Sequence, residues 1–572
     1  MALLLGVALT LVVRGYRFGE SNHAVYLVDA IRQTDPSLLE RDWWVQSTLQ
    51  YHFVFNAMTA GLMRAGLLEP AFLIGYLALA ALFHIAWRKI TLALGGNDAV
   101  YLLSVVFFYL LAGGIGLGMY HFLQDSAFLP SNIANVAMLW GVYFWIAGSP
   151  ASAGVCFGVA GLFHINHAVA GVGLWTGASL FEGRRGLTRG WWLGTLAVLA
   201  LSAVQIIPAA RVVLSRSGKL PLHEFVDLFV RLRHPHHFDP RAWHWGVWLA
   251  FLLPLPLAFV AARRMRAVGV ARTPELRRTT YLFALICAML ALALTGAGFW
   301  YASETLVQLN LYRFSVYPKL LGCVAGGWLV WEGLNARRLR AGWVLVIALL
   351  VLGTVALMFG RPALLRDHNA TVAAVAALLV VVALAFITDV RLNRPPRWGL
   401  LALATITALA VTAANRAVPA GVRVEGLQGN DRGYVELARW ASHHTPKDAL
   451  FLVPPDEESF RVHARRAIVI NFKGVPQLSA ELPEWRDRLC RVLDTDTRGL
   501  LALPRPMGRT LQAIRARYDG LPAEYHFGTA RHFGARYVVL TSGTNIPAGA
   551  HLVRSDSNGR YFLYDLQPEP GT

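Results

Sequence analysis

Residues 231–240, RLRHPHHFDP, place two arginines, three histidines and an aspartate within ten positions of a largely apolar chain. A metal site, a solvated charged loop and the wall of a binding pocket all fit such a stretch. Pro235 favours an extended conformation at His234, so the imidazoles can point in more than one direction. The choice among the three depends on which side of a membrane the stretch faces, and the rest of the chain predicts that side.

The composition is typical of a polytopic membrane protein. Of 572 residues, 55% are hydrophobic and only 15% are charged, whereas soluble proteins carry about 25% charged residues. The formal net charge of +19 does not indicate nucleic-acid binding, because the basic residues lie in short loops between apolar runs. In those loops they orient a membrane protein.

The apolar runs predict a polytopic α-helical protein with about 11–13 membrane helices. The predicted spans are residues 2–13, 70–87, 99–119, 132–148, 151–163, 167–181, 190–208, 245–262, 280–298, 314–333, 342–359, 371–388 and 399–414. The polar break HINH at 164–167 predicts two short helices that meet near one membrane face, because interrupted helices are tolerated where they line a wet cavity.

Loop charges predict that the N-terminus is cytoplasmic. In that orientation the cytoplasmic loops hold 17 lysines and arginines against three acidic residues, as membrane proteins prefer. These loops are residues 87–89, 182–190, 262–278, 335–340 and 389–397. The long loops 14–69 and 209–244, the break at 164–167 and the region after about residue 415 are then predicted to lie outside.

The region after the last predicted span changes character. Short β-rich runs, ALFLVPP, AIVINF, RYVVLTS and RYFLYDL, alternate with amphipathic stretches such as AELPEWRDRLCRVL. This alternation predicts a small α/β domain, and SNG at 557–559 predicts a closing hairpin. The predicted division is a transmembrane domain, 1–414, followed by an extracytoplasmic α/β domain, 415–572.

The first outer loop offers candidate catalytic acids. Glu20 lies just beyond the first span, and Asp42 ends an amphipathic stretch. We expect one of these carboxylates to act as a general base near the outer face. The alternative interpretation is an interfacial amphipathic helix whose charges stay solvated.

Two further clusters are polar where the chain is otherwise apolar. His121 and Asp125 have the i,i+4 spacing of one helix face, which suits a metal, a base or a local hydrogen bond. His164, Asn166 and His167 form the HINH break, and polar groups there are costly unless they face a polar cavity. The alternative for this break is a structural role that holds two half-helices together.

The 231–240 stretch suits anion binding on the outer side. Arg231 and Arg233 with His236 and His237 can donate to anionic oxygens without a metal. Zinc would need three or four convergent ligands, and their convergence does not follow from the sequence. We interpret Asp239 as a local partner of a neighbouring arginine.

Arg313 ends a predicted span on the outer side, next to Tyr312. An arginine at that depth needs an anionic partner, and a lipid phosphate is the natural one. The alternative is that its side chain extends to the lipid headgroups.

Taken together, these features resemble the GT-C class of membrane glycosyltransferases. They are a short first span, a long acidic outer loop ending in DPSLLERDWW, a polar break, an outer arginine and an outer α/β region containing TPKDALFLVPP. The resemblance covers the whole architecture and extends to a bacterial branch with a C-terminal periplasmic α/β domain. The acidic pair that usually follows the first span is absent, and FGES stands in its place.

The resemblance implies a multi-pass protein of the bacterial inner membrane that moves a hexosyl or pentosyl group from a polyprenyl-phosphate donor to a glycan, lipid or protein acceptor. Asp42 or Glu20 would be the base. The donor phosphate would be bound by Arg313, Arg231, Arg233, His236 and His237. The pocket would be lined by His164, Asn166, His167, His121, Asp125 and Tyr312. The C-terminal domain, with SFRVHARR and NFKG, would cover the site or bind the acceptor.

The resemblance implies no definite cofactor and leaves a divalent cation open. No nucleotide-binding loop is found, in agreement with a lipid-linked donor, and the expected partners include the lipid bilayer but no nucleic acid. Two other functions compete with the transferase. A transporter or flippase would show repeated halves and charges at the membrane midplane, and an inactive scaffold of the same fold would lack a working base.

Overall fold

The computed structural model describes residues 2–19, 21–111, 117, 121–215, 220–243, 245–269, 273–335, 432–541 and 549–566. Three predicted spans, at 342–359, 371–388 and 399–414, lie outside these residues, as does the predicted domain boundary near 415. Glu20 also lies outside them.

The apolar runs form helices close to the predicted positions. These are α1 (Ala2–Arg14), α6 (Leu68–Ala93), α7 (Asp98–Leu110), α8 (Pro130–Ile146), α9 (Pro150–Phe163), α10 (Ile165–Glu182), α11 (Arg189–Ser215), α14 (Trp245–Leu252), α15 (Pro254–Val268), α16 (Thr273–Leu292) and α18 (Val316–Asn335). The segments Leu68–Ala93, Arg189–Ser215 and Pro274–Phe299 are long and apolar enough to cross a membrane. Three shorter apolar helices span Ala2–Leu11, Asp98–Tyr109 and Pro150–Phe163.

Small residues allow α9 and α11 to pack closely. A Cβ added at Gly154 would lie 2.3 Å from the Cα of Gly194, and one at Gly158 would lie 2.7 Å from the carbonyl oxygen of Ala197. Glycines four residues apart on one helix let two backbones approach, as is common between membrane helices. The break predicted at 164–167 is confirmed, because the extended His164 (φ −150°, ψ 122°) separates α9 from α10.

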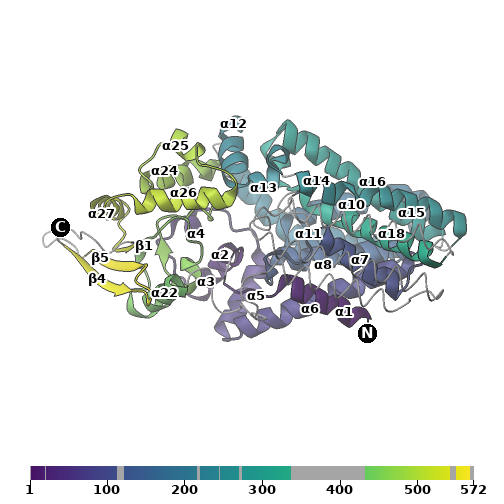
Figure 1. The fold of residues 1–572 in the computed structure, drawn as a ribbon, viewed down its shortest axis with the longest axis horizontal. Coiled ribbons are helices and arrows are strands. Elements are labelled where there is room, and N and C mark those ends of the chain that lie inside the picture. The colour runs from purple at the N-terminus through teal and green to yellow at the C-terminus, as the bar shows by residue number, and fades with distance from the viewer. Residues whose placement is uncertain are drawn as a thin grey trace, which may run out of the picture.

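The two long loops contain short helices instead of open coil. Between α1 and α6 these are α2 (His23–Tyr26), α3 (Val28–Thr34), α4 (Trp43–Ser47) and α5 (Phe53–Arg64). After α11 they are α12 (Leu222–Phe225), the π-helix η3 (Val226–Arg233), α13 (Pro235–Phe238) and η4 (Pro240–Ala242). Figure 1 shows the helical bundle on the right and the C-terminal region on the left, with α2 and α13 where they meet.

The C-terminal region is a mixed five-stranded sheet with helices around it. Its strands are β1 (Leu450–Leu452), β2 (Ala467–Ile468), β3 (Tyr537–Leu540), β4 (Ala550–Ser555) and β5 (Phe562–Leu566), in the order β2-β1-β3-β5-β4. The first three are parallel and the last two antiparallel, so the predicted α/β pattern and hairpin are confirmed. The described helices of this region are α22 (Arg432–His444), α23 (Phe460–Ala464), α24 (Leu482–Val492), α25 (Thr497–Leu501), α26 (Met507–Asp519) and α27 (Ala523–His532).

The C-terminal region shares a hydrophobic core with the loop after α11. Phe225, Phe229 and Leu232 are buried in one cluster with Trp485 and Leu489 of α24. Burial of such side chains is the main favourable term in association. Apolar contacts made by the loop 222–238 therefore hold the C-terminal region against the bundle.

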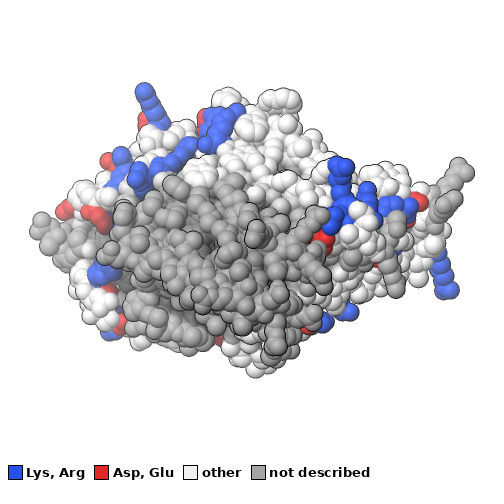
Figure 2. Space-filling model, turned by 45° about the vertical axis from the view of Figure 1, so that its right-hand side comes forward, with Lys and Arg blue, Asp and Glu red and all other residues white. Residues whose placement is uncertain are grey.

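The described lysines and arginines on one face of the molecule lie mainly in two groups. Figure 2 shows these groups toward the two ends of that face, with white surface between them along its upper part. The exposed arginines Arg263, Arg264 and Arg266 lie at the end of α15. This distribution is the one that a membrane-embedded bundle requires.

The stability of the C-terminal region should fall in acid because His526 is buried on α27. Its Nε2 donates to the carbonyl oxygen of Tyr518 at 3.0 Å, and burial lowers its pKa to about 4. The unfolded chain then binds a proton that the folded chain does not, and stability decreases as the pH falls below the unfolded value of about 6.5. We expect a loss of about 2 kcal/mol between about pH 7.5 and about pH 5 from this group.

Thermal unfolding in detergent at both pH values checks this expectation. The midpoint of thermal unfolding should differ less between the two pH values in His526→Phe than in the wild type. His532→Phe changes an exposed histidine of the same helix and should keep the wild-type difference. An unchanged pH dependence in His526→Phe would contradict the expectation.

Candidate active site

A large cavity lies between the helical bundle and the C-terminal region. Its volume is about 740 Å³, and its lining residues lie within 14–26, 49–51, 121–126, 164–169, 206–213, 229–238, 305–313 and 473–478. The first outer loop, the segment 121–126, the HINH break, the 231–240 stretch and the C-terminal region therefore meet at one place. A cavity of this size can hold a sugar with its phosphate, since ligand pockets run from about 300 to about 1,000 Å³.

The cavity is strongly basic. Its described lining holds five cationic side chains, against the single carboxylate of Asp125. The cationic residues are Arg14, Arg17, Arg233, Arg313 and Lys473. Such a wall attracts anions, and the low dielectric of a cleft strengthens the attraction.

Arg313 is a buried cation without a carboxylate partner among the described residues. It lies in the 3-10 turn η6 (Leu311–Ser315) and is only 8% exposed. Its Nη1 donates to His164 Nε2 at 2.6 Å, and its buried Nε has no hydrogen-bond partner in the described chain. A buried charge is costly unless it is paired, so this guanidinium is suited to an anionic ligand in the cavity.

Asp125 is held in an unusual turn. It belongs to η1 (Gln124–Ser126), and both Asp125 (φ +53°) and Ser126 (φ +57°) have left-handed backbones. Its Oδ2 accepts hydrogen bonds from Ser21 Oγ at 3.0 Å and from the backbone N–H of Asn22 at 3.4 Å. Strained residues of this kind cost about 1–3 kcal/mol and cluster at functional sites.

Asp42 does not line the cavity, contrary to the expectation of a base facing it. It is fully buried, and it caps α4 by accepting from the Val45 N–H at 3.1 Å. Its Oδ2 accepts from Arg461 Nε at 2.7 Å and from the Ile468 N–H at 3.0 Å. A carboxylate occupied in this way links the first loop to the C-terminal region and does not reach an acceptor in the cavity.

The 231–240 stretch is divided between the surface and the cavity. Arg231 is exposed and pairs with Asp227 at 2.7 Å, so its expected place at the phosphate is not supported. Arg233 is buried and lines the cavity, where its Nε donates to the carbonyl oxygen of Phe472 at 2.9 Å. Asp239 Oδ1 accepts from the backbone N–H of Arg241 at 3.1 Å, a local contact as expected.

The histidines of this stretch face the cavity. His234, His236 and His237 all belong to its lining. Burial, followed by the nearby charges of His237 and Arg233, lowers the pKa of His236 well below its usual range. At neutral pH the positive charge of this wall therefore comes from Arg233 and Lys473 and not from His236.

Of the remaining predicted pocket residues, some line the cavity and others lie outside its lining. His121, Asn166 and His164 line the cavity, but His121 and Asp125 do so from a turn and not from one helix face. His167 is buried outside the lining, with Nε2 2.8 Å from Asn135 Oδ1. Tyr312 is also outside it, because its hydroxyl donates to the Ala293 carbonyl at 2.7 Å.

Several cavity residues were not expected from the sequence. Arg14 and Arg17 end the first span, and Tyr26 and Tyr51 come from the first loop. The RGYRF stretch after an apolar run was the available signal for the arginines. Over the described part of the chain no group of three or more His, Cys, Asp or Glu side chains could hold a metal ion.

The fold has relatives among solved structures. ArnT from Cupriavidus metallidurans bound to undecaprenyl phosphate is similar with a TM-score of 0.50 and 15% identity, over 99% of this chain and 97% of that one. Its apo state gives a TM-score of 0.49 at 14% identity, over 98% and 97% of the two chains. An archaeal oligosaccharyltransferase, AglB from Archaeoglobus fulgidus, gives 0.49 at 12% identity over 94% of this chain and 69% of that one.

Sequence comparisons add one short match. Residues 432–492 match the family described as "Domain of unknown function (DUF6798)". No curated protein matches the chain. The similarities over the whole length are therefore similarities of fold.

Proposed function

We propose that this chain, which has the fold of the GT-C glycosyltransferases, transfers a sugar from a polyprenyl-phosphate carrier to an acceptor hydroxyl. The observation that carries the proposal is Arg313, a buried guanidinium without a carboxylate partner in the described chain, in a cavity between bundle and C-terminal region. A phosphate on a lipid provides the missing counter-charge. The apolar bundle beside the cavity provides the environment for the lipid chain.

The residues of the cavity suit an inverting displacement. Asp125 accepts the proton of the acceptor hydroxyl, and the acceptor oxygen attacks the anomeric carbon of the donor sugar. The bond between that carbon and the phosphate oxygen breaks, and its electron pair remains on the released polyprenyl phosphate. Arg313, Arg233 and Lys473 stabilise the charge that develops there.

Other residues support these roles. His164 accepts from Arg313 and so fixes the direction of the guanidinium, while His121 and Asn166 complete the wall. Glu20 remains the second proposed carboxylate, since it directly precedes Ser21, which binds Asp125. Asp42, Arg231, His167 and Tyr312 have no part in the proposed chemistry.

The proposed location is the bacterial inner membrane, with the N-terminus cytoplasmic and the region 415–572 on the periplasmic side. The support for this orientation is the excess of basic residues in the loops that the sequence predicts to be cytoplasmic. The donor then reaches the cavity from the outer leaflet.

Arg313→Gln should weaken the binding of undecaprenyl phosphate by about ten- to a hundredfold, because charge-assisted hydrogen bonds contribute about 1.5–3 kcal/mol. Glutamine keeps a donor for His164 but removes the charge. Retention of the lipid in native mass spectrometry of the purified protein measures the effect. Arg231→Gln, which changes an exposed arginine outside the cavity, is the control and should retain lipid as the wild type does.

Transfer itself is tested in liposomes with labelled undecaprenyl-phosphate sugars and a mixture of envelope acceptors. We expect labelled acceptor in the presence of the wild-type protein only. Equal lipid retention by Arg313→Gln and the wild type would contradict the role of Arg313. Movement of the donor across the bilayer without any transfer would favour a flippase instead.

A further inference from the structure

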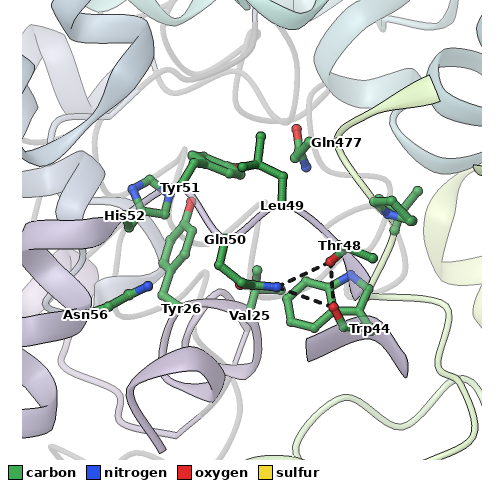
Figure 3. Close-up of a pocket in the computed structure, with 12 residues that line it drawn as sticks. Val25, Tyr26, Trp44, Thr48, Leu49, Gln50, Tyr51, His52, Asn56 and Gln477 are labelled. Atoms are coloured by element: carbon green, nitrogen blue, oxygen red, sulfur yellow. Dashed lines mark hydrogen bonds between the residues drawn. The ribbon is translucent and has the colours of Figure 1, made fainter. Parts of the chain in front are cut away.

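A small side pocket adjoins the large cavity. Its volume is about 20 Å³, and Figure 3 shows its lining residues, which come from α2, α4, the segment 48–52, the first turn of α5 and the segment 475–477. It shares a wall with the cavity, made of Val25, Tyr26, Leu49, Tyr51, Val475 and Gln477. A space of about 10–15 Å³ is enough for one water-sized group, so the pocket admits a single such group and excludes a sugar ring.

Three buried polar atoms of the lining residues have no hydrogen-bond partner in the described chain. They are His52 Nε2, Asn56 Oδ1 and Trp44 Nε1. Buried polar groups are nearly always satisfied, and leaving one unsatisfied is costly. Figure 3 shows His52 and Asn56 on one side of the pocket and Trp44 on the other.

The hydrogen-bonding character of these atoms follows from their neighbours. His52 Nδ1 lies 3.4 Å from the Phe163 carbonyl oxygen, which can only accept, so Nδ1 carries the proton. Burial lowers the pKa of His52 to about 3, so the ring is neutral and Nε2 accepts. Asn56 Nδ2 donates to Asp29 Oδ2 at 2.8 Å, which leaves Asn56 Oδ1 as an acceptor.

The acceptor side of the pocket is close to the phosphate-binding arginine. The His52 ring lies 5.1 Å from the ring of His164, whose Nε2 accepts from Arg313. A sugar whose phosphate is bound by Arg313 therefore has His52 within reach. The ring centre of His52 lies 4.6 Å from that of Tyr26 and 4.4 Å from that of Tyr51, so both tyrosines border the same space.

We propose that this pocket receives one hydroxyl group of the transferred sugar and thereby selects the donor. The proposal rests on the proposed function. The hydroxyl donates its one proton to His52 Nε2 or Asn56 Oδ1, and its oxygen accepts from Trp44 Nε1 on the opposite side. Two acceptors exclude a carboxylate there, and an ammonium group is disfavoured because none of the lining residues is a carboxylate that could pair with its buried charge.

Donors that differ by one hydroxyl test the proposal. Undecaprenyl-phosphate glucose, galactose and arabinose are first compared with the wild-type protein in liposomes, and the donor transferred best is then compared with its monodeoxy analogues. We expect one analogue to be transferred with a kcat/KM about ten- to a hundredfold lower than that of its parent. The hydroxyl that this analogue lacks is the one that would pair with the buried polar atoms of the pocket.

Two variants assign that discrimination to the pocket. Trp44→Phe removes the donor and His52→Phe removes an acceptor. In each variant the kcat/KM values for parent and analogue should differ by no more than about threefold. Trp43→Phe, the same change at the neighbouring residue outside the lining, should keep the wild-type ratio. Two independent variants guard against a folding defect in either one.

Failure of the side-pocket proposal and failure of the proposed function give different results in these experiments. Wild-type ratios in both Trp44→Phe and His52→Phe, or equal transfer of every analogue, would overturn the pocket while leaving the transferase intact; the pocket would then hold a structural water only. Absence of transfer from every donor by the wild type would overturn the proposed function and this inference with it.

Discussion

We expect Asp125→Asn to lower kcat for the proposed sugar transfer by about 10²–10⁴-fold, the contribution of a general base. Asparagine keeps an oxygen that can accept from Ser21 Oγ and the Asn22 N–H, and it tolerates the left-handed backbone observed at this position. The substitution therefore removes the negative charge and leaves the turn in place. Initial rates with saturating donor measure the effect.

Asp239→Asn is the matched control. Asp239 also accepts from a backbone N–H, but it is buried and does not line the cavity. We expect it to retain the wild-type kcat. A wild-type rate in Asp125→Asn would exclude Asp125 as the base, and a loss in Glu20→Gln alone would transfer that role to Glu20.

Asp42→Ala destabilises the protein by about 3–5 kcal/mol, because it leaves a buried charge without its partner. The Arg461 side chain is 1% exposed and the Asp42 side chain is fully buried. The substitution also leaves the N–H groups of Val45 and Ile468 without their acceptor. The midpoint of thermal unfolding in detergent should fall, while the protein that remains folded at low temperature keeps its transfer activity.

Asp35→Ala provides the comparison for this prediction. Asp35 pairs with Lys447 across the same two regions, but both side chains are partly exposed, at 33% and 64%. Exposed ion pairs contribute little, so we expect no measurable change in the midpoint. Loss of transfer in folded Asp42→Ala, with an unchanged midpoint, would contradict a structural role for Asp42.

The architecture could be predicted because it depends on local patterns. Apolar runs located the long helices of the bundle, and the β-rich runs and the SNG turn located the strands and the hairpin. The short helices inside the loops 14–69 and 209–244 were not located by apolar runs. The break at His164 was visible as polar residues within an apolar run. In each case the signal and the structure occupy the same short stretch of chain.

The roles of the acids could not be predicted, because they depend on distant partners. Asp42 is committed to Arg461, 419 positions away, and nothing in the first loop indicates that pairing. Asp125 occupies a turn with two left-handed residues, neither of which is glycine, so the i,i+4 spacing wrongly indicated a helix. Tyr312 and His167 satisfy buried partners instead of facing the cavity.

The core shared by the loop 222–238 and α24 has a consequence for biosynthesis. A ribosome completes Phe225 and Phe229 long before it reaches Trp485, so α24 does not yet cover this apolar face while the intervening spans are being inserted. The last part of the chain to be made is therefore the part that closes the loop. Closure of the cavity by the C-terminal region is a late event of synthesis, and a prematurely terminated chain would expose the apolar face that α24 covers in the finished protein.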